Sequence, residues 1–391
     1  VFAALLFPER FAQIENELRQ HLPDKQAFFT IVQACARYLD GIVRNENWAK
    51  YDLIGMTVSH EQLIPSLCLA RRLRLIAPDS RIIVGGAVLS EDTSRVLLEQ
   101  FSEIDIATFG EGEQTLLEIV NTIETGNGMF LDTVPGLTFR SGESIKQTTL
   151  RKVIPDLDLL PFPDYTDFFS HEMVAGTKKV VPCIGLEISL GCTWGKCSFC
   201  NLSHQWQNTI RNKSPDHFAN EVANQVRRYR SSRGVICDTN TYLQGKVMNK
   251  VASLGLDLDL FVELSAHVSR VEFISLMEAG VRSMQVGTEA FCDNILNRFC
   301  KGTTAIDNLQ VLKWAMEFNI KVGHNLITEY PGTVSEDINE TLRVIRYARN
   351  FAPPKTIAYS LSFYSSAFNH PENHNVKSYK LPEYYQTIYP S

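Results

Sequence analysis

Three cysteines stand close together near the middle of the chain. Cys192, Cys197 and Cys200 fall within nine residues, in the stretch Gly191-Cys192-Thr193-Trp194-Gly195-Lys196-Cys197-Ser198-Phe199-Cys200. Thiolates at this spacing in one loop can wrap a single cuboidal iron–sulfur cluster. Three protein ligands leave one iron of a 4Fe–4S cluster without a thiolate, and chemistry at a metal requires such an open position. The spacing therefore predicts a reactive 4Fe–4S centre.

A structural zinc site is the main local alternative to this cluster. Zinc needs a fourth ligand, and His204 lies four residues after Cys200. The other six cysteines are scattered, and several stand in apolar runs where a small buried thiol is the ordinary role. This distribution predicts a reduced cytoplasmic protein with one metal site, and it argues against a secreted disulfide framework. The scattered cysteines are at positions 35, 68, 183, 237, 292 and 300.

Composition indicates a globular protein with more than one core. The 391 residues are 44% hydrophobic and 21% charged, a length for which two domains are the natural expectation. A net charge of −6 gives no reason to expect nucleic acid or an anionic membrane as a partner. No run of about 18 apolar residues is present to span a bilayer. Because the sequence starts at Val1 without an initiator Met, we expect it to begin inside a longer product.

The first part of the chain alternates strands and helices after a helical lead-in over residues 1–48. Strand–helix–strand order predicts a parallel sheet with helical crossovers, which binds ligands at the carboxyl ends of its strands. Gly85 and Gly86 end one strand, where they either admit a ligand to the backbone or simply turn the chain. The predicted strands are 52–58, 81–86 and 104–109, and the predicted helices are 61–76 and 91–101.

A second strand–helix series begins just before the cysteines. Six parallel strands with helices outside predict an incomplete (β/α)6 barrel, whose site lies at the carboxyl ends of the strands. The fold class is therefore α/β. We expect a lead-in and Rossmann-like domain over 1–130, a linker over 131–182, the barrel over 183–365 and an extension over 366–391. The predicted barrel strands are 186–190, 234–238, 260–264, 283–287, 320–327 and 356–362.

The motifs together resemble the radical S-adenosylmethionine (SAM) superfamily, and within it the enzymes that mature ribosomally made peptides, many of them cobalamin-dependent C-methyltransferases. The usual cysteine spacing there is Cys-x3-Cys-x2-Cys, whereas this chain has four residues between its first two cysteines. The resemblance runs from about Tyr51 to Pro390. It is carried by these segments, among others: Tyr51-Asp52-Leu53-Ile54-Gly55-Met56-Thr57, Val84-Gly85-Gly86-Ala87, Phe109-Gly110-Glu111-Gly112-Glu113, Gln285-Val286-Gly287-Thr288-Glu289 and Tyr330-Pro331-Gly332.

The resemblance implies one 4Fe–4S cluster on the three cysteines, with SAM bound through its amine and carboxylate to the open iron. Reductive cleavage of SAM gives a 5′-deoxyadenosyl radical, so the cofactor carries the hard step. By the same resemblance Phe199 packs near the adenine and Glu289 meets the ribose hydroxyls. Further cofactor-binding candidates are Glu263, Gln285 and Asn325. For each carboxylate the alternative is an ordinary surface or capping charge.

A short segment after the cysteines has a plain structural explanation. Ser214 followed by Pro215 is typical of a helix start, with serine as the N-cap and proline at the first helical position. Arg211 and Lys213 have no such local explanation. They are expected either to play a structural part or to meet a carboxylate of cofactor or substrate.

The reaction depends on whether cobalamin binds, and two alternatives stay open. The amino-terminal sheet resembles a cobalamin-binding domain, complete or degenerate, but the Asp-x-His-x-x-Gly motif is absent. Relatives also carry a further strand before the position where this sequence starts. With cobalamin the resemblance implies C-methylation of a peptide. Without it, the reaction is backbone splicing to a β-amino acid, crosslinking or epimerisation, and this second group is the preferred expectation. A non-catalytic metal-binding scaffold for a peptide partner is the alternative of another class.

The expected partners follow from the same resemblance. They are a ribosomal precursor peptide as substrate, a small leader-peptide-binding protein and an external electron donor. No leader-binding module is recognisable in the sequence, which is why a separate partner chain is expected.

Overall fold

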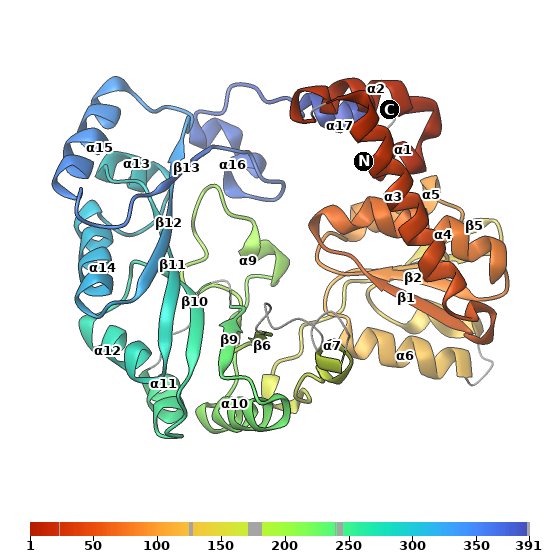
Figure 1. Ribbon diagram of the computed structural model, residues 1–391, viewed down its shortest axis with the longest axis horizontal. Helices are drawn as coiled ribbons and strands as arrows, with labels where there is room; N and C mark the ends of the chain where they lie inside the picture. Colours follow the sequence, from red (N-terminus) through yellow and green to blue (C-terminus); the bar gives the residue numbers. More distant parts are fainter. Residues whose placement is uncertain (23, 125–127, 171–181, 239, 241–244, 389–391) are drawn as a thin grey trace. The chain divides into compact units, whose positions relative to one another are not determined.

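The computed structural model describes residues 1–22, 24–124, 128–170, 182–238, 240 and 245–388. The chain divides into two compact units, one made of residues 1–153 with 380–391 and the other of residues 154–379 (Figure 1). Each unit has its own sheet and core, as expected for this length. In the part of the chain described, no helix is both long and apolar enough to cross a membrane.

The first unit is built on a five-stranded sheet in the order β1-β2-β3-β4-β5. The strands β1 (Leu53–Thr57), β2 (Arg81–Gly85) and β3 (Ile106–Thr108) are parallel. The apolar residues of β2 are buried, which is usual for a parallel strand covered on both faces. The predicted strands at 52–58, 81–86 and 104–109 are therefore confirmed.

Helices supply the cores on both sides of this sheet. The crossover helices are α4 (Leu63–Ile76), α5 (Glu91–Gln100) and α6 (Glu113–Glu124). Ile119 of α6 packs with Ile83 and Ile106 of the sheet, and Leu73 of α4 belongs to a separate cluster with Ile82. The lead-in forms α1 (Ala3–Leu6), α2 (Phe11–Leu18) and α3 (Lys25–Arg44), and the carboxyl-terminal α17 (Glu383–Ile388) also belongs to this unit (Figure 1).

A hairpin lies where the sequence predicts only a linker. The strands β4 (Leu137–Ser141) and β5 (Ser144–Gln147) pair antiparallel, and β4 continues the first sheet beside β3. The turn between them contains Gly142 at φ +61°, a conformation that glycine adopts without strain. The first unit thus extends to Val153, whereas the sequence places its end at residue 130. Residues 171–181 of the expected linker lie outside the described part.

The second unit carries the six-stranded sheet expected from the sequence. All neighbouring pairs are parallel, in the order β6-β9-β10-β11-β12-β13, which is also their order along the chain. This arrangement of parallel strands with helical crossovers confirms the α/β fold class. The strands are β6 (Ile184–Leu186), β9 (Arg233–Ile236), β10 (Asp259–Ser265), β11 (Val281–Glu289), β12 (Lys321–Thr328) and β13 (Lys355–Ala358).

Helices cover one face of this sheet and leave the other for the site. Alternate residues of β10, such as Val262 and Leu264, are buried in the helix-side core with Phe273 and Leu276 of α12. The residues between them point to the opposite, inner face because side chains alternate along a strand. The covering helices are α10 (Pro215–Tyr229), α11 (Gly245–Ala252), α12 (Arg270–Glu278), α14 (Ala305–Glu317) and α15 (Ser335–Tyr347). Helix α13 (Asp293–Arg298) packs instead in a separate cluster with Phe199 and Tyr330. Short elements complete the unit: α7 (Thr166–Ser170), β7 (Ser189–Leu190), α9 (Leu202–Gln205), β8 (Arg211–Asn212) and α16 (Ser366–Asn369).

Candidate cofactor site at the carboxyl edge of the second sheet

The cysteine loop leaves the sheet directly after β6 and is fixed at its base. β7 pairs antiparallel with β8, which brings the two ends of the loop together. Asp238, just after β9, accepts hydrogen bonds from the backbone N–H of Ile188 (2.8 Å) and from Ser189 Oγ (2.5 Å). Burial raises the pKa of Asp238 to about 6, although these hydrogen bonds act to lower it. The carboxyl group therefore ties the start of the cysteine loop to the neighbouring strand.

The middle of the loop is held by segments that are distant in sequence. Ser198 donates its backbone N–H to the carbonyl of Phe299 (2.8 Å), and its hydroxyl bonds Tyr330 Oη (2.7 Å). Trp194 Nε1 donates to the carbonyl of Cys300 (2.6 Å). The carbonyl of Ser198 accepts from the N–H of Ala367, in α16 (2.9 Å). The loop is thus a preorganised feature of the fold.

The three cysteine side chains lie near one another in this loop and form no disulfide. Burial raises the pKa of Cys197 to about 12. The other two thiols and Glu289 also raise this pKa, whereas the charge of Lys301 lowers it. Burial also raises the pKa of Cys200. Among the described residues, no three His, Cys, Asp or Glu side chains are arranged around a position for one metal ion. A set of three neighbouring thiols fits a multi-iron cluster, since thiolates are the ligands of iron–sulfur centres.

A buried ion pair lies beside the cysteines. Lys301 Nζ donates to Glu289 Oε1 at 3.0 Å, and the two side chains are only 9% and 12% exposed. Glu289 ends β11 at φ +58°, after a register shift between Val286 and Glu289. Burial works to lower the pKa of Lys301, but the charges of Glu289 and Cys197 outweigh it and raise the pKa. The pair therefore places a carboxyl group and an ammonium group next to the cysteine loop.

Phe199 lies in the same cluster of groups. Lys301 Nζ is 5.8 Å from the centroid of its ring, within cation–π distance. The ring also packs edge-on against Phe299, with centroids 5.2 Å apart. The structure thus brings together Phe199, Glu289 and the three cysteines, which the sequence selects, and adds Lys301, which it does not. Helix α13 separates Lys301 from Glu289 in the sequence, so no local sequence motif marks Lys301.

Asn240 is a second site residue that the sequence analysis does not identify. Its Oδ1 accepts the backbone N–H of Ser265 at the end of β10 (2.9 Å). Its Nδ2 lies 3.4 Å from Thr193 Oγ1 and 4.0 Å from Cys192 Sγ. The side chain therefore links a strand end to the cysteine loop, and an amide donor facing a cluster ligand is a usual outer contact of a metal site.

The other three candidates from the sequence lie on the inner face of the sheet. Glu263 and Gln285 are register partners on β10 and β11, and Gln285 is in turn the register partner of Gly323 on β12. Asn325 stands two residues further along β12, and its carbonyl accepts from Thr288 Oγ1 (3.0 Å). Gln285 is four residues before Glu289, roughly 13 Å along the strand. Glu263 and Gln285 thus form a row below the level of the Glu289–Lys301 pair.

The segment after the cysteine loop has structural roles. Ser214 Oγ accepts the N–H of His217 (3.2 Å), so it caps α10, with Pro215 at the first helical position. Lys213 Nζ pairs with Glu221 at 2.6 Å, and the two side chains are 7% and 0% exposed. Arg211 Nη1 donates to the carbonyl of Ile154 (2.8 Å). Lys213 is therefore occupied by a buried partner in the helix that follows it, α10.

The carboxyl edge of the first sheet is marked mainly by glycines. Gly86 has φ +122°, and a Cβ there would overlap the backbone of Val58, so close packing of two loops accounts for this glycine. Gly110 has φ +79°, and a Cβ at Gly112 would have no atom within 4 Å. A Cβ at Gly110 would lie 3.2 Å from Leu150 Cδ1, so the backbone is open to a ligand at Gly112, at the edge where such sheets bind one.

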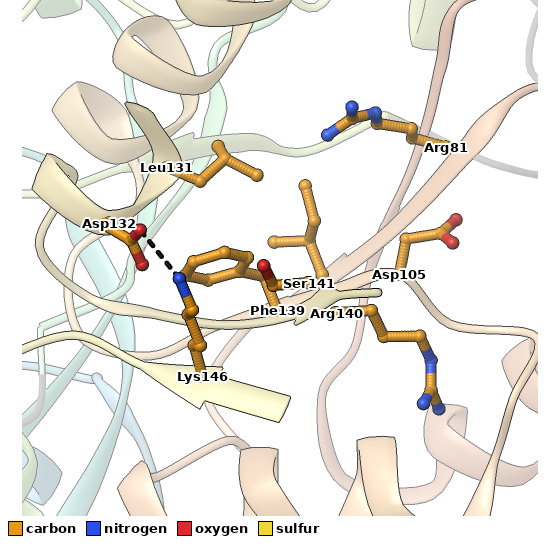
Figure 2. A pocket seen from close by; sticks show the side chains of 9 residues that line it. Arg81, Asp105, Leu131, Asp132, Phe139, Arg140, Ser141 and Lys146 are labelled. Atoms are coloured by element: carbon orange, nitrogen blue, oxygen red, sulfur yellow. Dashed lines mark hydrogen bonds and ion pairs between the residues drawn. The ribbon is translucent and has the colours of Figure 1, made fainter. Parts of the chain in front are cut away.

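A hollow of about 530 Å³ in the first unit lies at the opposite edge (Figure 2). Arg81 is the first residue of β2, so the hollow is at the amino end of the parallel strands. Its charged groups mostly have partners: Lys146 pairs with Asp132 at 3.0 Å, and Arg140 Nε donates to the carbonyl of Ile104 (2.9 Å). The hollow is lined by Arg81, Asp105, Ile106, Leu131, Asp132, Phe139, Arg140, Ser141 and Lys146.

Comparison with known proteins identifies the second unit. Residues 186–345, which include the cysteine loop and strands β9 to β12, match the family model described as the radical SAM superfamily. The chain therefore carries a radical SAM domain. The cofactors of such a domain are a 4Fe–4S cluster and SAM, and the cysteine loop with the Glu289–Lys301 pair is where this chain has residues that fit them.

Similar proteins extend the likeness over both units. An uncharacterized methyltransferase of Pyrococcus horikoshii is 22% identical over 297 residues, which are 75% of this chain and 63% of that protein. The anaerobic magnesium-protoporphyrin IX monomethyl ester cyclase of Cereibacter sphaeroides is 25% identical over 80% of this chain and 56% of its own length. The chain thus spans a little over half of these two relatives.

A solved structure has the same fold. The radical SAM methyltransferase TsrM of Kitasatospora setae, with tryptophan substrate and a SAM analogue bound, superposes with a TM-score of 0.66 at 15% identity, over 84% of this chain and 68% of that one. Another structure of TsrM contains cobalamin and a 4Fe–4S cluster, and its TM-score is 0.65. The likeness establishes the arrangement of a Rossmann-like sheet followed by a radical SAM sheet.

Proposed function

We propose that this chain belongs to a radical SAM enzyme that transfers a methyl group to an organic substrate, with cobalamin as a second cofactor. The observation that carries the radical SAM part is the convergence of three thiols, Phe199 and the Glu289–Lys301 ion pair at one edge of the second sheet. The methyl transfer is supported by the relatives, two of which are called methyltransferases.

The residues at this edge have distinct tasks in the proposal. Cys192, Cys197 and Cys200 hold the cluster and leave one iron open to the amine and carboxylate of SAM. Bound together, the cluster and SAM supply a 5′-deoxyadenosyl radical for hydrogen abstraction. Glu289 accepts hydrogen bonds from the ribose hydroxyls, and Lys301 holds the Glu289 side chain in position. Phe199 offers an apolar face to the adenine, while Asn240 orients the loop that carries Cys192.

The first sheet is the proposed support for cobalamin. The open backbone at Gly112 fits one side of a flat cofactor at the carboxyl edge, as in a sheet that binds its ligand there. When bound, this cofactor supplies the methyl group. The hollow beside Arg81 plays no part in the proposal, because it lies at the amino edge.

This proposal departs from the expectation drawn from the sequence. From the sequence, splicing, crosslinking or epimerisation of a peptide is the preferred expectation. The comparisons favour the alternative, methyl transfer, since the likeness to a methyltransferase structure that contains cobalamin covers 84% of this chain. A peptide substrate, a leader-binding partner protein and an external electron donor remain predictions.

The test is to reconstitute the anaerobically purified protein with iron, sulfide and hydroxocobalamin, and to measure bound iron, sulfide and corrin. The same preparation is then given SAM and a strong reductant, and 5′-deoxyadenosine is quantified. Iron with retained corrin supports the proposal. Iron and 5′-deoxyadenosine without corrin would redirect it to a rearrangement without methyl transfer. Zinc in place of iron would overturn it.

A further inference from the structure

The row of inner-face residues below the cofactor edge has no structural explanation within the described residues. Glu263, Gln285 and Gly323 are register partners on three neighbouring strands, so their Cα atoms lie side by side, about 4.8 Å apart from strand to strand. A Cβ at Gly323 would meet nothing closer than the carbonyl of Met284, at 4.0 Å. Two long polar side chains therefore stand beside an open glycine on the inside of the barrel.

Glu263 differs from the other enclosed carboxylates of this unit. Glu221 pairs with Lys213, Glu289 with Lys301 and Asp337 with Arg298. For Glu263, no ion pair or hydrogen bond to another described residue exists, although the side chain is half-buried and burial raises its pKa. A carboxylate that is partly withdrawn from water without a partner loses hydration that nothing replaces. The enclosed carboxylates above all have a partner among the described residues, so the lack of one at Glu263 favours a bound ligand as its partner.

Gln285 provides a second polar side chain next to Glu263. Its side chain is exposed and makes no hydrogen bond to another described residue. A carboxamide next to a carboxylate offers a second acceptor oxygen, and together they suit a donor with several N–H groups. Charge-assisted hydrogen bonds of this kind are short and directional, so they can fix the position of a bound molecule.

We propose that Glu263 and Gln285 bind a protonated amine of the substrate, one layer below the cofactor edge. This inference rests on the proposed function, because the row is a substrate site only if radical chemistry occurs at that edge. The amine then anchors the substrate in the barrel, and Glu263 acts as a specificity-determining residue. Substrates that lack an amine, or carry a carboxylate at that position, are disfavoured.

The test uses butylammonium as the probe and 1-butanol as its uncharged counterpart, titrated by saturation-transfer NMR against protein reconstituted with its cluster. We expect butylammonium to bind at least about tenfold more tightly than butanol, and Glu263→Gln to abolish that preference. Gln285→Ala should weaken it by a smaller factor. Glu278→Gln is the matched control, since this exposed residue of α12 carries the same charge without a place in the row.

The outcomes separate this inference from the proposed function. Equal binding of the two probes, or equal loss in Glu263→Gln and Glu278→Gln, overturns the amine site. Circular dichroism and iron content of each variant show whether the protein is intact. Formation of 5′-deoxyadenosine, measured in parallel without the probe, reports on the radical chemistry alone. If that product forms while the amine preference is absent, the amine site fails and the proposed function stands.

Discussion

The carboxyl edges of the two parallel sheets differ in what they present to a ligand. At the first sheet the described edge is mainly backbone: Gly86 lets two loops pack closely, and Gly112 leaves the backbone open. At the second sheet the edge carries the thiols and the Phe199 ring on a loop that hydrogen bonds tie to the fold, together with the Glu289–Lys301 pair.

This difference shows what each edge can do. An open backbone accommodates a large cofactor that brings its own reactivity, and it needs few side chains. A reactive cluster instead needs ligands of one kind in fixed positions, with partners that orient them. Substitutions at the second edge should therefore have larger effects than those elsewhere in the chain.

The largest expected effect is the loss of a cluster ligand. Cys197→Ala should leave the reconstituted protein almost free of iron and lower 5′-deoxyadenosine formation by more than about 100-fold, because a ligand is lost and not merely an outer contact. Iron analysis and product quantification measure both. Cys183→Ala, an exposed cysteine of the same unit, is the control and should keep its iron. Full iron in the Cys197 variant would contradict the ligand assignment.

A smaller effect is expected at the buried pair. Lys301→Met leaves Glu289 charged and enclosed, which should lower the free energy of unfolding by about 3 kcal/mol and weaken SAM binding roughly tenfold. Urea unfolding and calorimetry measure the two quantities. The double variant Lys301→Met/Glu289→Gln removes the stranded charge, so it should regain most of the stability but not the affinity. Recovery of both would mean that the pair serves stability only.

The sequence predicts this edge unevenly. Cys192, Cys197 and Cys200 are recognisable because the three ligands lie in one loop. The parallel strands of both sheets are recognisable because their apolar runs are long enough. Lys301 and Asn240 are not recognisable, since their roles depend on which strand ends meet in space. The hairpin β4–β5 is missed for a different reason: its second strand is mostly exposed, so it lacks the apolar pattern of a buried strand.

The Lys213–Glu221 pair is a buried ion pair away from the thiols, and it can be compared with Lys301–Glu289. It is at least as buried as Lys301–Glu289, but it lies at the start of α10 and not among the thiols. Lys213→Met should therefore lower the free energy of unfolding by a similar amount, about 3 kcal/mol. SAM affinity, measured by calorimetry on the folded variant, should stay as in the wild type. A tenfold loss of affinity would instead place Lys213 at the cofactor.

The smallest expected effect is at the cap of the same helix. Ser214→Ala removes the acceptor for the N–H of His217, so the free energy of unfolding should fall by about 1 kcal/mol. The measurement is the shift of the urea midpoint at constant slope. Ser232→Ala is the control, an exposed serine without a side-chain hydrogen bond to a described residue, and should change stability by less than about 0.5 kcal/mol. Iron content should be unchanged in both variants, because neither hydroxyl contacts the cysteine loop. A Ser214 variant that lost iron would show that the start of α10 helps to hold the cluster, and the division between a structural helix and a reactive edge would then fail.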